Sequence, residues 1–341
     1  MVSSFMERGR IYPKTFFPVL LLFLALFVLG VVASILFGAR SLSLQEVLGG
    51  LFGGGELYES SVVQKRIVRT VFALCCGAAL GIAGVLMQAV TRNPLADPAI
   101  LGVNNGAAFF VVCGVAFFQM NTAREYIWFA LAGALLTAIF VLGIGSMGRG
   151  GASPLKLVLA GAATSAALSS LVTAVLIPRL NAMEEFRFWQ AGSVGAGTWD
   201  SFSLLLPFLV VGTIAAVISA PALNALALGD ETATGLGVKT AFLRYVAALA
   251  GVILCGATTA VAGPIGFVGL LSAHVIRALI GPDLRYLIPM SALAGAVILT
   301  VSDVAGRLIG RPGELEVGVL TAFIGAPLLI ILAVKAKVRA T

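Results

Sequence analysis

The residues that could do chemistry in this chain are few, and several of them interrupt long apolar runs. Asp303 is the clearest case, because a carboxylate inside an apolar stretch is costly in lipid and is therefore a candidate for a proton or ion relay. Gln88, Asn104 and Asn105 are uncharged polar residues in similar surroundings. We expect these four side chains to face other helices or a polar pathway and not lipid.

His274 is the only histidine, and it lies three residues before Arg277. A zinc site or a catalytic histidine needs further ligands or partners, and no second histidine exists, so a structural hydrogen bond is the favoured interpretation. The cysteines lie in apolar runs without metal-binding spacing, which is typical of small buried apolar side chains. They are Cys75, Cys76, Cys113 and Cys255.

Motifs for bond-making chemistry are missing from the sequence. The stretch GLGVKT, Gly235 to Thr240, approaches a phosphate-binding loop but does not match GxxxxGK[ST]. No HExxH or GxSxG motif appears. The sequence therefore predicts neither an enzyme nor an ATPase, and an energy-driven pump would need a separate ATPase polypeptide.

Composition indicates that lipid surrounds most of the chain. Of 341 residues, 60% are hydrophobic and 11% are charged, and the mean hydropathy is +1.06. A soluble domain carries about a quarter charged residues, so this chain cannot cover a surface that faces water. The formal net charge of +7 comes from basic loops without interleaved aromatics, which excludes a nucleic-acid-binding face.

About ten apolar windows are long enough to be membrane helices, and they predict an all-α polytopic bundle. They are residues 16–38, 70–90, 99–118, 126–147, 155–177, 201–221, 241–261, 287–306, 317–334 and a shorter, more polar one at 265–280. The first is too long for a cleaved signal and is interpreted as a retained span. Gly77, Gly81 and Gly84 have helical spacing, which predicts close helix packing. We expect one transmembrane domain over residues 1–341.

The distribution of basic residues orients the bundle. If the N-terminus lies inside, 13 of the 22 lysines and arginines fall in inner loops and tails. Inner loops carry the excess of basic residues in membrane proteins, so both termini are expected in the cytoplasm.

The stretch TRNPLADPAILGVNNG, Thr91 to Gly106, concentrates turn-forming residues at one membrane edge. Asn93-Pro94 and Asp97-Pro98 each pair a helix-capping residue with a proline suited to the first helical position. Leu95 is a single bulky apolar residue between them. Two interpretations remain open, a capped hairpin with helix contacts or a rigid constriction beside a polar pathway.

Five segments in order resemble the FecCD family, the permease subunits of ABC importers for iron-siderophores, haem and cobalamin. They are residues 66–108, 188–199, 223–238, 263–308 and 313–327, beginning with RIVRTVFALCCGAALGIAGVLMQAVTRNPLADPAILG. The resemblance implies a ten-helix subunit of the bacterial cytoplasmic membrane that pairs with a second permease subunit. It further implies two ATPase subunits that bind ATP and magnesium, an extracytoplasmic binding protein, and a large iron chelate as cargo. No cofactor is implied in this chain.

The resemblance also implies roles for particular residues. Asn93, Leu95 and Ser153 would form the cytoplasmic gate. Arg66, Arg69 and Arg307 would dock the binding protein, and Asp303 would join Arg307 in a network at a helix end. Residues of segment 221–240 would form the coupling loop on the ATPase, as two short helices: Leu228, Gly229, Asp230, Glu231, Gly235, Leu236 and Gly237.

Three positions depart from the family pattern. Val68, Ala273 and Glu316 stand where the family usually has proline, and we expect these losses to relax local turns. One hypothesis is that this chain is half of a heterodimer; a homodimer remains open. A secondary transporter or channel without an ATPase is the alternative function, but it would require more intramembrane acidic or histidine residues. Ferric siderophore is the expected cargo, with haem and cobalamin open.

Overall fold

The computed structural model describes residues 13–52, 57–120, 122–147 and 154–338, and all regular structure in these ranges is helical. The elements are α2 (Pro13–Leu36), α3 (Leu44–Phe52), α4 (Leu57–Thr91), the 3₁₀ helix η1 (Pro98–Leu101), α5 (Val103–Phe118), α6 (Ala123–Ser146), α7 (Pro154–Leu176), α8 (Leu180–Gln190), α9 (Trp199–Ala227), α10 (Asp230–Gly235), α11 (Thr240–Ala262), α12 (Val268–Ile280), α13 (Leu284–Ile309) and α14 (Val317–Val338).

The helices confirm the predicted membrane bundle. Seven of the described helices are long and apolar enough to cross a membrane, and three shorter apolar helices lie at residues 103–118, 268–280 and 317–331. Together they coincide with the ten apolar windows. The largest difference is at α4, which has 35 residues and continues well beyond the expected window at 70–90.

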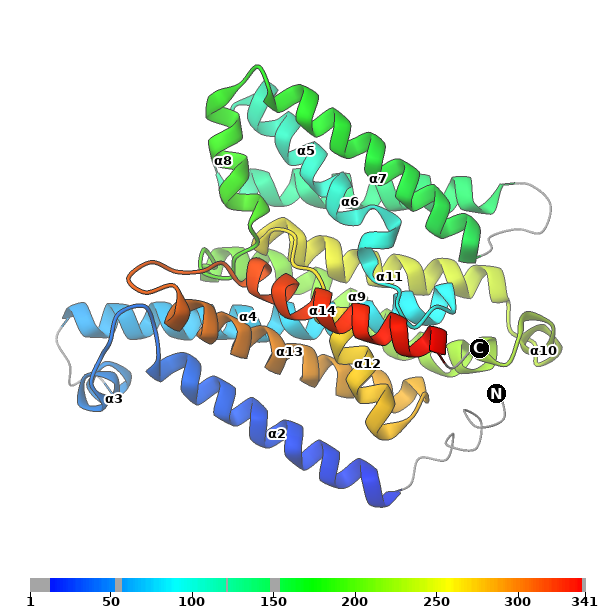
Figure 1. Cartoon of the computed structure of the whole chain (residues 1–341), viewed down its shortest axis with the longest axis horizontal. Coiled ribbons are helices and arrows are strands. Elements are labelled where there is room, and N and C mark those ends of the chain that lie inside the picture. Colours follow the sequence, from blue (N-terminus) through cyan, green and yellow to red (C-terminus); the bar gives the residue numbers. More distant parts are fainter. Residues whose placement is uncertain (1–12, 53–56, 121, 148–153, 339–341) are drawn as a thin grey trace.

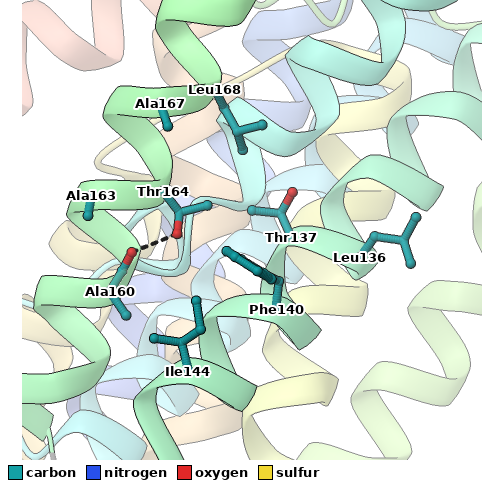
Figure 2. Close-up of a pocket in the computed structure, with 9 residues that line it drawn as sticks. All are labelled: Leu136, Thr137, Phe140, Ile144, Ala160, Ala163, Thr164, Ala167 and Leu168. Atoms are coloured by element: carbon teal, nitrogen blue, oxygen red, sulfur yellow. Dashed lines mark hydrogen bonds between the residues drawn. The ribbon is translucent and has the colours of Figure 1, made fainter.

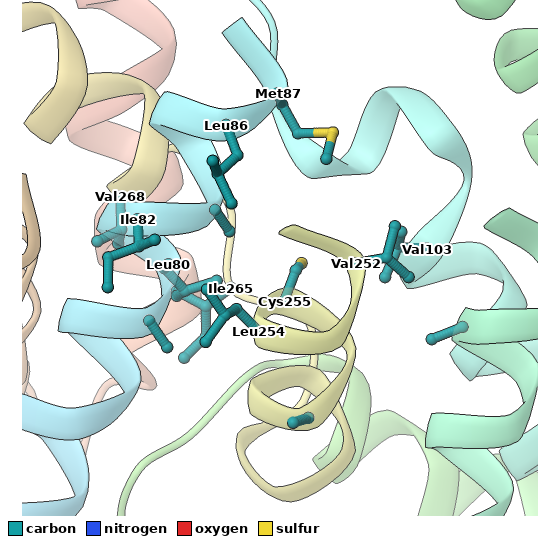
Figure 3. Packing of buried hydrophobic residues seen from close by; sticks show 14 of the residues in the cluster. Leu80, Ile82, Leu86, Met87, Val103, Val252, Leu254, Cys255, Ile265 and Val268 are labelled. Atoms are coloured by element: carbon teal, nitrogen blue, oxygen red, sulfur yellow. The ribbon is translucent and has the colours of Figure 1, made fainter. Parts of the chain in front are cut away.

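The centre of the bundle is built from α4, α11 and α13, whose apolar segments are largely buried, whereas only a small share of the apolar segments of α2, α7 and α9 is buried. Figure 1 shows α4 and α13 running through the middle, with α2 on one side and α5, α6 and α7 on the other. Leu86 and Met87 of α4 face Gly251 of α11. The close view of the core shows Leu254 of α11 beside Leu80 of α4 (Figure 3). This arrangement keeps aliphatic surface toward lipid and small residues inside.

A seam of glycines brings α4 against its neighbours, as their spacing predicts. A Cβ on Gly77 would meet the backbone of Gly295 in α13, and one on Gly81 would meet the Ser291 carbonyl. A Cβ on Gly84 would meet the backbone of Gly269 in α12. Only glycine permits such close backbone approach, which in lipid supplies packing energy that the hydrophobic effect does not.

Two ends of the bundle can be distinguished in Figure 1. The first, which we call the α10 end, carries α10, the start of α2 and the end of α14. The opposite end, the α8 end, carries α3, α8 and the connection between α13 and α14. Asp230 and Glu231 belong to α10 itself, whereas Asp303 and Arg307 lie in the last turns of α13, toward the α8 end.

Candidate functional site

At the α10 end, one carboxylate lies between two arginines from different helices. Arg92, directly after α4, donates from Nη2 to Oδ1 of Asp230 at 2.7 Å. Arg244 of α11 donates from Nη2 to Oδ1 and Oδ2 of Asp230 at 2.7 and 3.0 Å. Arg92 Nη2 also donates to the Leu226 carbonyl at 2.7 Å. These three charged residues, which we call the Asp230 cluster, join the ends of α4, α9, α10 and α11.

The turn that follows Arg92 is closed by its first residue. Asn93 accepts hydrogen bonds from the Leu95 N–H through Oδ1 at 3.0 Å and from the Ala96 N–H through its carbonyl at 3.1 Å. Such a side-chain turn holds its members in fixed positions. Leu95 is partly buried. Ser153, the third predicted gate residue, lies outside the described residues.

The second half of this stretch starts the next span, as predicted. Asp97 Oδ1 accepts from the Ala99 N–H at 3.0 Å and caps η1, with Pro98 at its first position. Gly102 then adopts a left-handed conformation, with φ of 71°, before α5 begins. Burial raises the pKa of the Asp97 carboxyl, while the hydrogen bond from Ala99 opposes that shift.

The segment between α9 and α11 differs from the expectation of two short helices. Residues 221–227 continue α9 through Pro221, and only α10 is a separate short helix. Gly229 and Gly237 flank α10 with φ of 118° and 81°, conformations that favour glycine. Leu228 and Leu236 are 60% and 65% exposed. The segment thus presents apolar side chains at the α10 end of the bundle.

At the α8 end, a second carboxylate also lies between two arginines. Arg69 of α4 donates from Nη2 to Oδ1 of Asp303 at 2.7 Å and from Nε to both carboxylate oxygens at 3.1 Å. Arg307 Nη2 lies 2.9 Å from Oδ2 of Asp303, one turn away on α13. Arg69 Nη1 also donates to Oε2 of Glu314 at 2.6 Å. We call these four residues the Asp303 cluster; its contact between Asp303 and Arg307 agrees with the predicted helix-end network.

The arginines at this end also bind carbonyls at the end of α2 and in the residues that follow it. Arg307 donates to Ser34 Oγ and to the carbonyls of Ser34 and Phe37 at 2.8, 3.1 and 3.0 Å. Arg66 donates to the Ile35, Leu36 and Arg40 carbonyls at 2.9, 2.8 and 2.6 Å. Basic side chains commonly satisfy the carbonyls that a helix leaves free at its C-terminus.

Arg66 and Arg307 are therefore structural anchors of α2 in this conformation, and both are buried, with 6% and 1% exposure. Arg69 is oriented by Asp303 and Glu314. Docking of a binding protein by these three arginines stays a prediction.

The three positions that lack proline lie mainly in helices and not in turns. Val68 is inside α4, and Ala273 is inside α12. The expected relaxation of a local turn is wrong at these two sites, because each residue lies within a continuous helix. Glu316 lies just before α14, where its carbonyl accepts from the Val319 N–H at 3.1 Å.

The four pathway candidates lie in different surroundings. Asn104 Oδ1 accepts from Thr259 Oγ1 of α11 at 3.0 Å, and Asn105 is partly buried beside it in the sequence. Gln88 is buried, and its amide atoms have no partner among the described residues. Asp303 is held in its cluster. The structure therefore indicates no continuous relay through these side chains in the part of the chain it describes.

His274 is partly buried on α12, and Arg277 lies one turn further along the same helix. Within the described residues, no group of three or more histidine, cysteine, aspartate or glutamate side chains could hold a metal ion. All four cysteines are free thiols, and Cys76 and Cys255 are buried.

An apolar cavity of about 590 Å³ lies between α6 and α7. Leu136, Phe140 and Leu168 contribute much of its wall, and Thr164 turns its hydroxyl back to the Ala160 carbonyl at 2.7 Å (Figure 2). Among the described residues, no charged side chain lines this cavity. It is therefore a mainly apolar recess, in which the hydroxyls of Thr137 and Thr164 are the polar side-chain groups among the described lining residues.

Comparison with known proteins places these features in context. Residues 26–335 match the FecCD transport family. The chain is 43% identical over 269 residues to the ferric enterobactin transport system permease protein FepD of Escherichia coli strain K12, covering 78% of this chain and 80% of that protein.

Two further relatives extend the comparison. The iron(3+)-hydroxamate import system permease protein FhuB of Bacillus subtilis strain 168 is 41% identical over 273 residues, covering 80% of this chain and 71% of that protein. The hemin transport system permease protein HmuU of Yersinia pestis is 32% identical over 291 residues, with coverages of 83% and 84%.

The fold also matches a solved structure, described as an inward-facing conformation of a metal-chelate type ABC transporter. The TM-score is 0.78 and the sequence identity 30%, with 95% of this chain and 99% of that chain covered. Similarity therefore extends over nearly the whole of both chains.

Proposed function

Because this chain belongs to the FecCD transport family, in which it is a permease subunit of a binding-protein-dependent ABC importer, we propose that it carries a ferric siderophore inward across the bacterial cytoplasmic membrane. It is a transport subunit and not a catalytic one. The observation that carries the choice of cargo is the 43% identity to a ferric enterobactin permease over most of both chains. A hydroxamate permease and a hemin permease are also relatives, so large iron chelates are the common theme.

In this proposal the α10 end faces the cytoplasm, and both termini lie on that side. Support comes from the excess of inner lysines and arginines and from the start of α2 and the end of α14 at the α10 end. The turn at Leu95 and segment 223–238 share that end, because Arg92 contacts both Leu226 and Asp230. A topology that separated them across the membrane would contradict the proposal.

Asn93 and Leu95, together with Ser153, form the inner gate of the proposed pathway. The gate is supported by the turn that Asn93 closes, since a fixed turn can hold an apolar side chain across an opening where a loose loop could not. Replacing Leu95 with glycine would remove the apolar obstruction. The proposed gate predicts leakage of cargo or uncoupled ATP hydrolysis in vesicles containing Leu95→Gly.

The segment around α10 contacts the two ATPase subunits. Those subunits bind ATP and magnesium, and this chain binds no cofactor of its own in the proposal. The exposed Leu228 and Leu236 support this contact, because exposed apolar side chains beside polar ones are typical of protein interfaces. Asp230 and Glu231 supply negative charge at the start of α10. Gly229 and Gly237 adopt positive φ on either side of α10 and allow the turns that bring these residues to the surface, and Gly235 is the last residue of the helix.

The α8 end receives the extracytoplasmic binding protein in this proposal. Arg66, Arg69 and Arg307 lie there, and Arg69 is paired with the carboxylate of Glu314, whose side chain is 39% exposed. A binding-protein carboxylate could replace Glu314 on Arg69, whereas Arg66 and Arg307 would first have to leave the α2 carbonyls. We propose that Arg69 makes the first contact.

A second permease subunit would cover the exposed face of α7. The exposed side chains of α9 are mainly large and aliphatic, such as Leu206, Val211 and Ile218, which suits lipid. Those of α7 include many small and hydroxyl-bearing residues, among them Ser169 and Thr173. Small and hydroxyl side chains favour helix contact or a polar path over lipid. The chain itself does not distinguish an identical partner from a different one.

Reconstitution in vesicles with the ATPase and binding protein tests the proposal. Uptake of labelled ferric enterobactin, ferric hydroxamate and hemin would be compared, and we expect uptake of a ferric siderophore that needs both ATP and binding protein. Inactivating the ATPase should abolish uptake, while a proton uncoupler with ATP held constant should leave it intact. Uptake of hemin alone, or uptake abolished only by the uncoupler, would contradict the proposal.

A further inference from the structure

The Asp230 cluster directly connects the segment assigned to the ATPase with the turn assigned to the gate. Arg92 is bonded to Asp230 on one side and is joined by its peptide bond to Asn93 on the other. Asn93 in turn fixes the N–H groups of Leu95 and Ala96. Movement of Asp230 relative to α4 must therefore either carry the Arg92 side chain with it or break the ion pair.

The backbone of Arg92 indicates that its side chain is needed here. Its φ of 50° lies in the left-handed region, where glycine or asparagine is usual and other residues are destabilised. A non-glycine residue in such a conformation persists when surrounding contacts hold it in place. For Arg92 those contacts are Asp230 and the Leu226 carbonyl.

The structure around α10 permits it to move as a unit. Gly229 and Gly237 flank the helix at positive φ, and such permissive positions can absorb a change of direction. Ala233 is the buried residue of α10. Asp230 thus supplies an ionic attachment on a helix that has little apolar contact with the bundle.

We propose that Asp230 is a positioning residue that transmits displacement of α10 to the turn at Asn93 and Leu95 through Arg92, while Arg244 orients its carboxylate. This inference rests on the proposed roles of α10 and the gate. Arg244 donates to both carboxylate oxygens and leaves Oδ1 shared with Arg92, so the two arginines act on the same group. An ion pair this exposed can be broken and re-formed during a transport cycle at low cost.

The test uses the complete reconstituted importer and measures cargo molecules taken up per ATP hydrolysed. Asp230→Asn keeps the size of the side chain but removes its charge. We expect ATP hydrolysis to continue while uptake per ATP falls on the order of tenfold, the scale of a typical coupling between sites. Asp200→Asn, an exposed carboxylate in the first turn of α9, is the matched control and should keep the parent ratio.

Two further variants test whether Arg92 and Asp230 act through one ion pair or independently. They are Arg92→Gln and the double variant that combines Arg92→Gln with Asp230→Asn. If both residues act through their ion pair, the double variant should have the same uptake per ATP as either single variant. Losses that multiply, or a normal ratio in Asp230→Asn, would overturn the inference. Loss of ATPase from the purified Asp230→Asn complex would also overturn it, since Asp230 would then act in assembly. Failure of the parent importer to transport would instead contradict the proposed function.

Discussion

The two ends of this protein use the same arrangement, one aspartate between two arginines, in opposite surroundings. At the α8 end the side chains of Asp303, Arg307 and Arg69 are 1%, 2% and 13% exposed. At the α10 end those of Asp230 and Arg92 are 48% and 34% exposed, and that of Arg244 is 14% exposed. The chemistry is shared, so differences in behaviour should arise from burial.

Burial changes what such a cluster can do. A buried charge that loses its partner retains the full cost of leaving water, so the Asp303 cluster is difficult to open. An exposed ion pair gives little net stability because water and salt compete with it. The Asp303 cluster is therefore suited to fixing α2, α4 and α13 together, and the Asp230 cluster to an adjustable connection.

Asp303→Ala should have the largest effect on stability. It leaves the buried Arg307 without its carboxylate, and breaking a buried pair from one side typically costs about 3–5 kcal/mol. Thermal unfolding in detergent, followed by tryptophan fluorescence, should show a large fall in midpoint or little folded protein. Asp200→Ala, which removes an exposed carboxylate on α9, is the control. An unfolding midpoint equal to that of the parent would show that the Asp303 cluster does not hold α2, α4 and α13 together.

Arg307→Lys should have the next largest effect. Arg307 reaches Asp303, Ser34 Oγ and two carbonyls at the end of α2, and a lysine ammonium cannot reproduce that planar set of donors. Leaving buried acceptors unsatisfied costs about 1–3 kcal/mol, so the midpoint should fall although the charge is conserved. The same exchange at Arg92, which is partly exposed, should change the midpoint little. Equal falls in the midpoint for Arg307→Lys and Arg92→Lys would show that burial does not account for the difference between the two clusters.

Much of the fold could be predicted from the sequence because lipid imposes simple rules. Helix length, apolar content and glycine spacing are local properties, and they gave the ten windows and the packing face of Gly77, Gly81 and Gly84. Segment 221–227 was predicted to lie outside the span, because it was assigned to the polar coupling loop at 221–240, whereas it continues α9. Proline is tolerated inside membrane helices, and α9 continues through it.

The charged clusters could be predicted only where the partners are close in sequence. Asp303 and Arg307 are four residues apart on one helix, and the family resemblance already implied their contact. Arg69 and Asp303 are separated by 234 positions, and Arg92 and Asp230 by 138. No local pattern pairs residues at such separations. Arg92 appeared in the sequence as one of many inner basic residues, and its left-handed backbone is visible only in the structure.

Asp230→Asn should change stability much less than either substitution at the α8 end. Exposed ion pairs contribute roughly 0–1 kcal/mol, so the thermal midpoint should stay close to that of the parent even if transport is uncoupled. The measurement is the same fluorescence melt, with Asp303→Asn as the matched exchange in the buried cluster. If Asp230→Asn lowered the midpoint as much as Asp303→Asn, the Asp230 cluster would also fix its helices together and would not be an adjustable connection.

The smallest expected effect concerns Arg69, whose guanidinium contacts both a buried and an exposed carboxylate. Glu314 is 39% exposed and Asp303 is 1% exposed, so one arginine reports on both environments. A double-mutant cycle with Arg69→Gln and Glu314→Gln should give a coupling of about 0.2–1 kcal/mol at low salt, typical of exposed pairs. At 1 M salt the screening length is about 3 Å, and this coupling should become undetectable. The coupling of Arg69 to Asp303 should persist at the same salt concentration, because solvent ions cannot reach a buried pair; loss of both couplings together would show that the outer cluster opens to water.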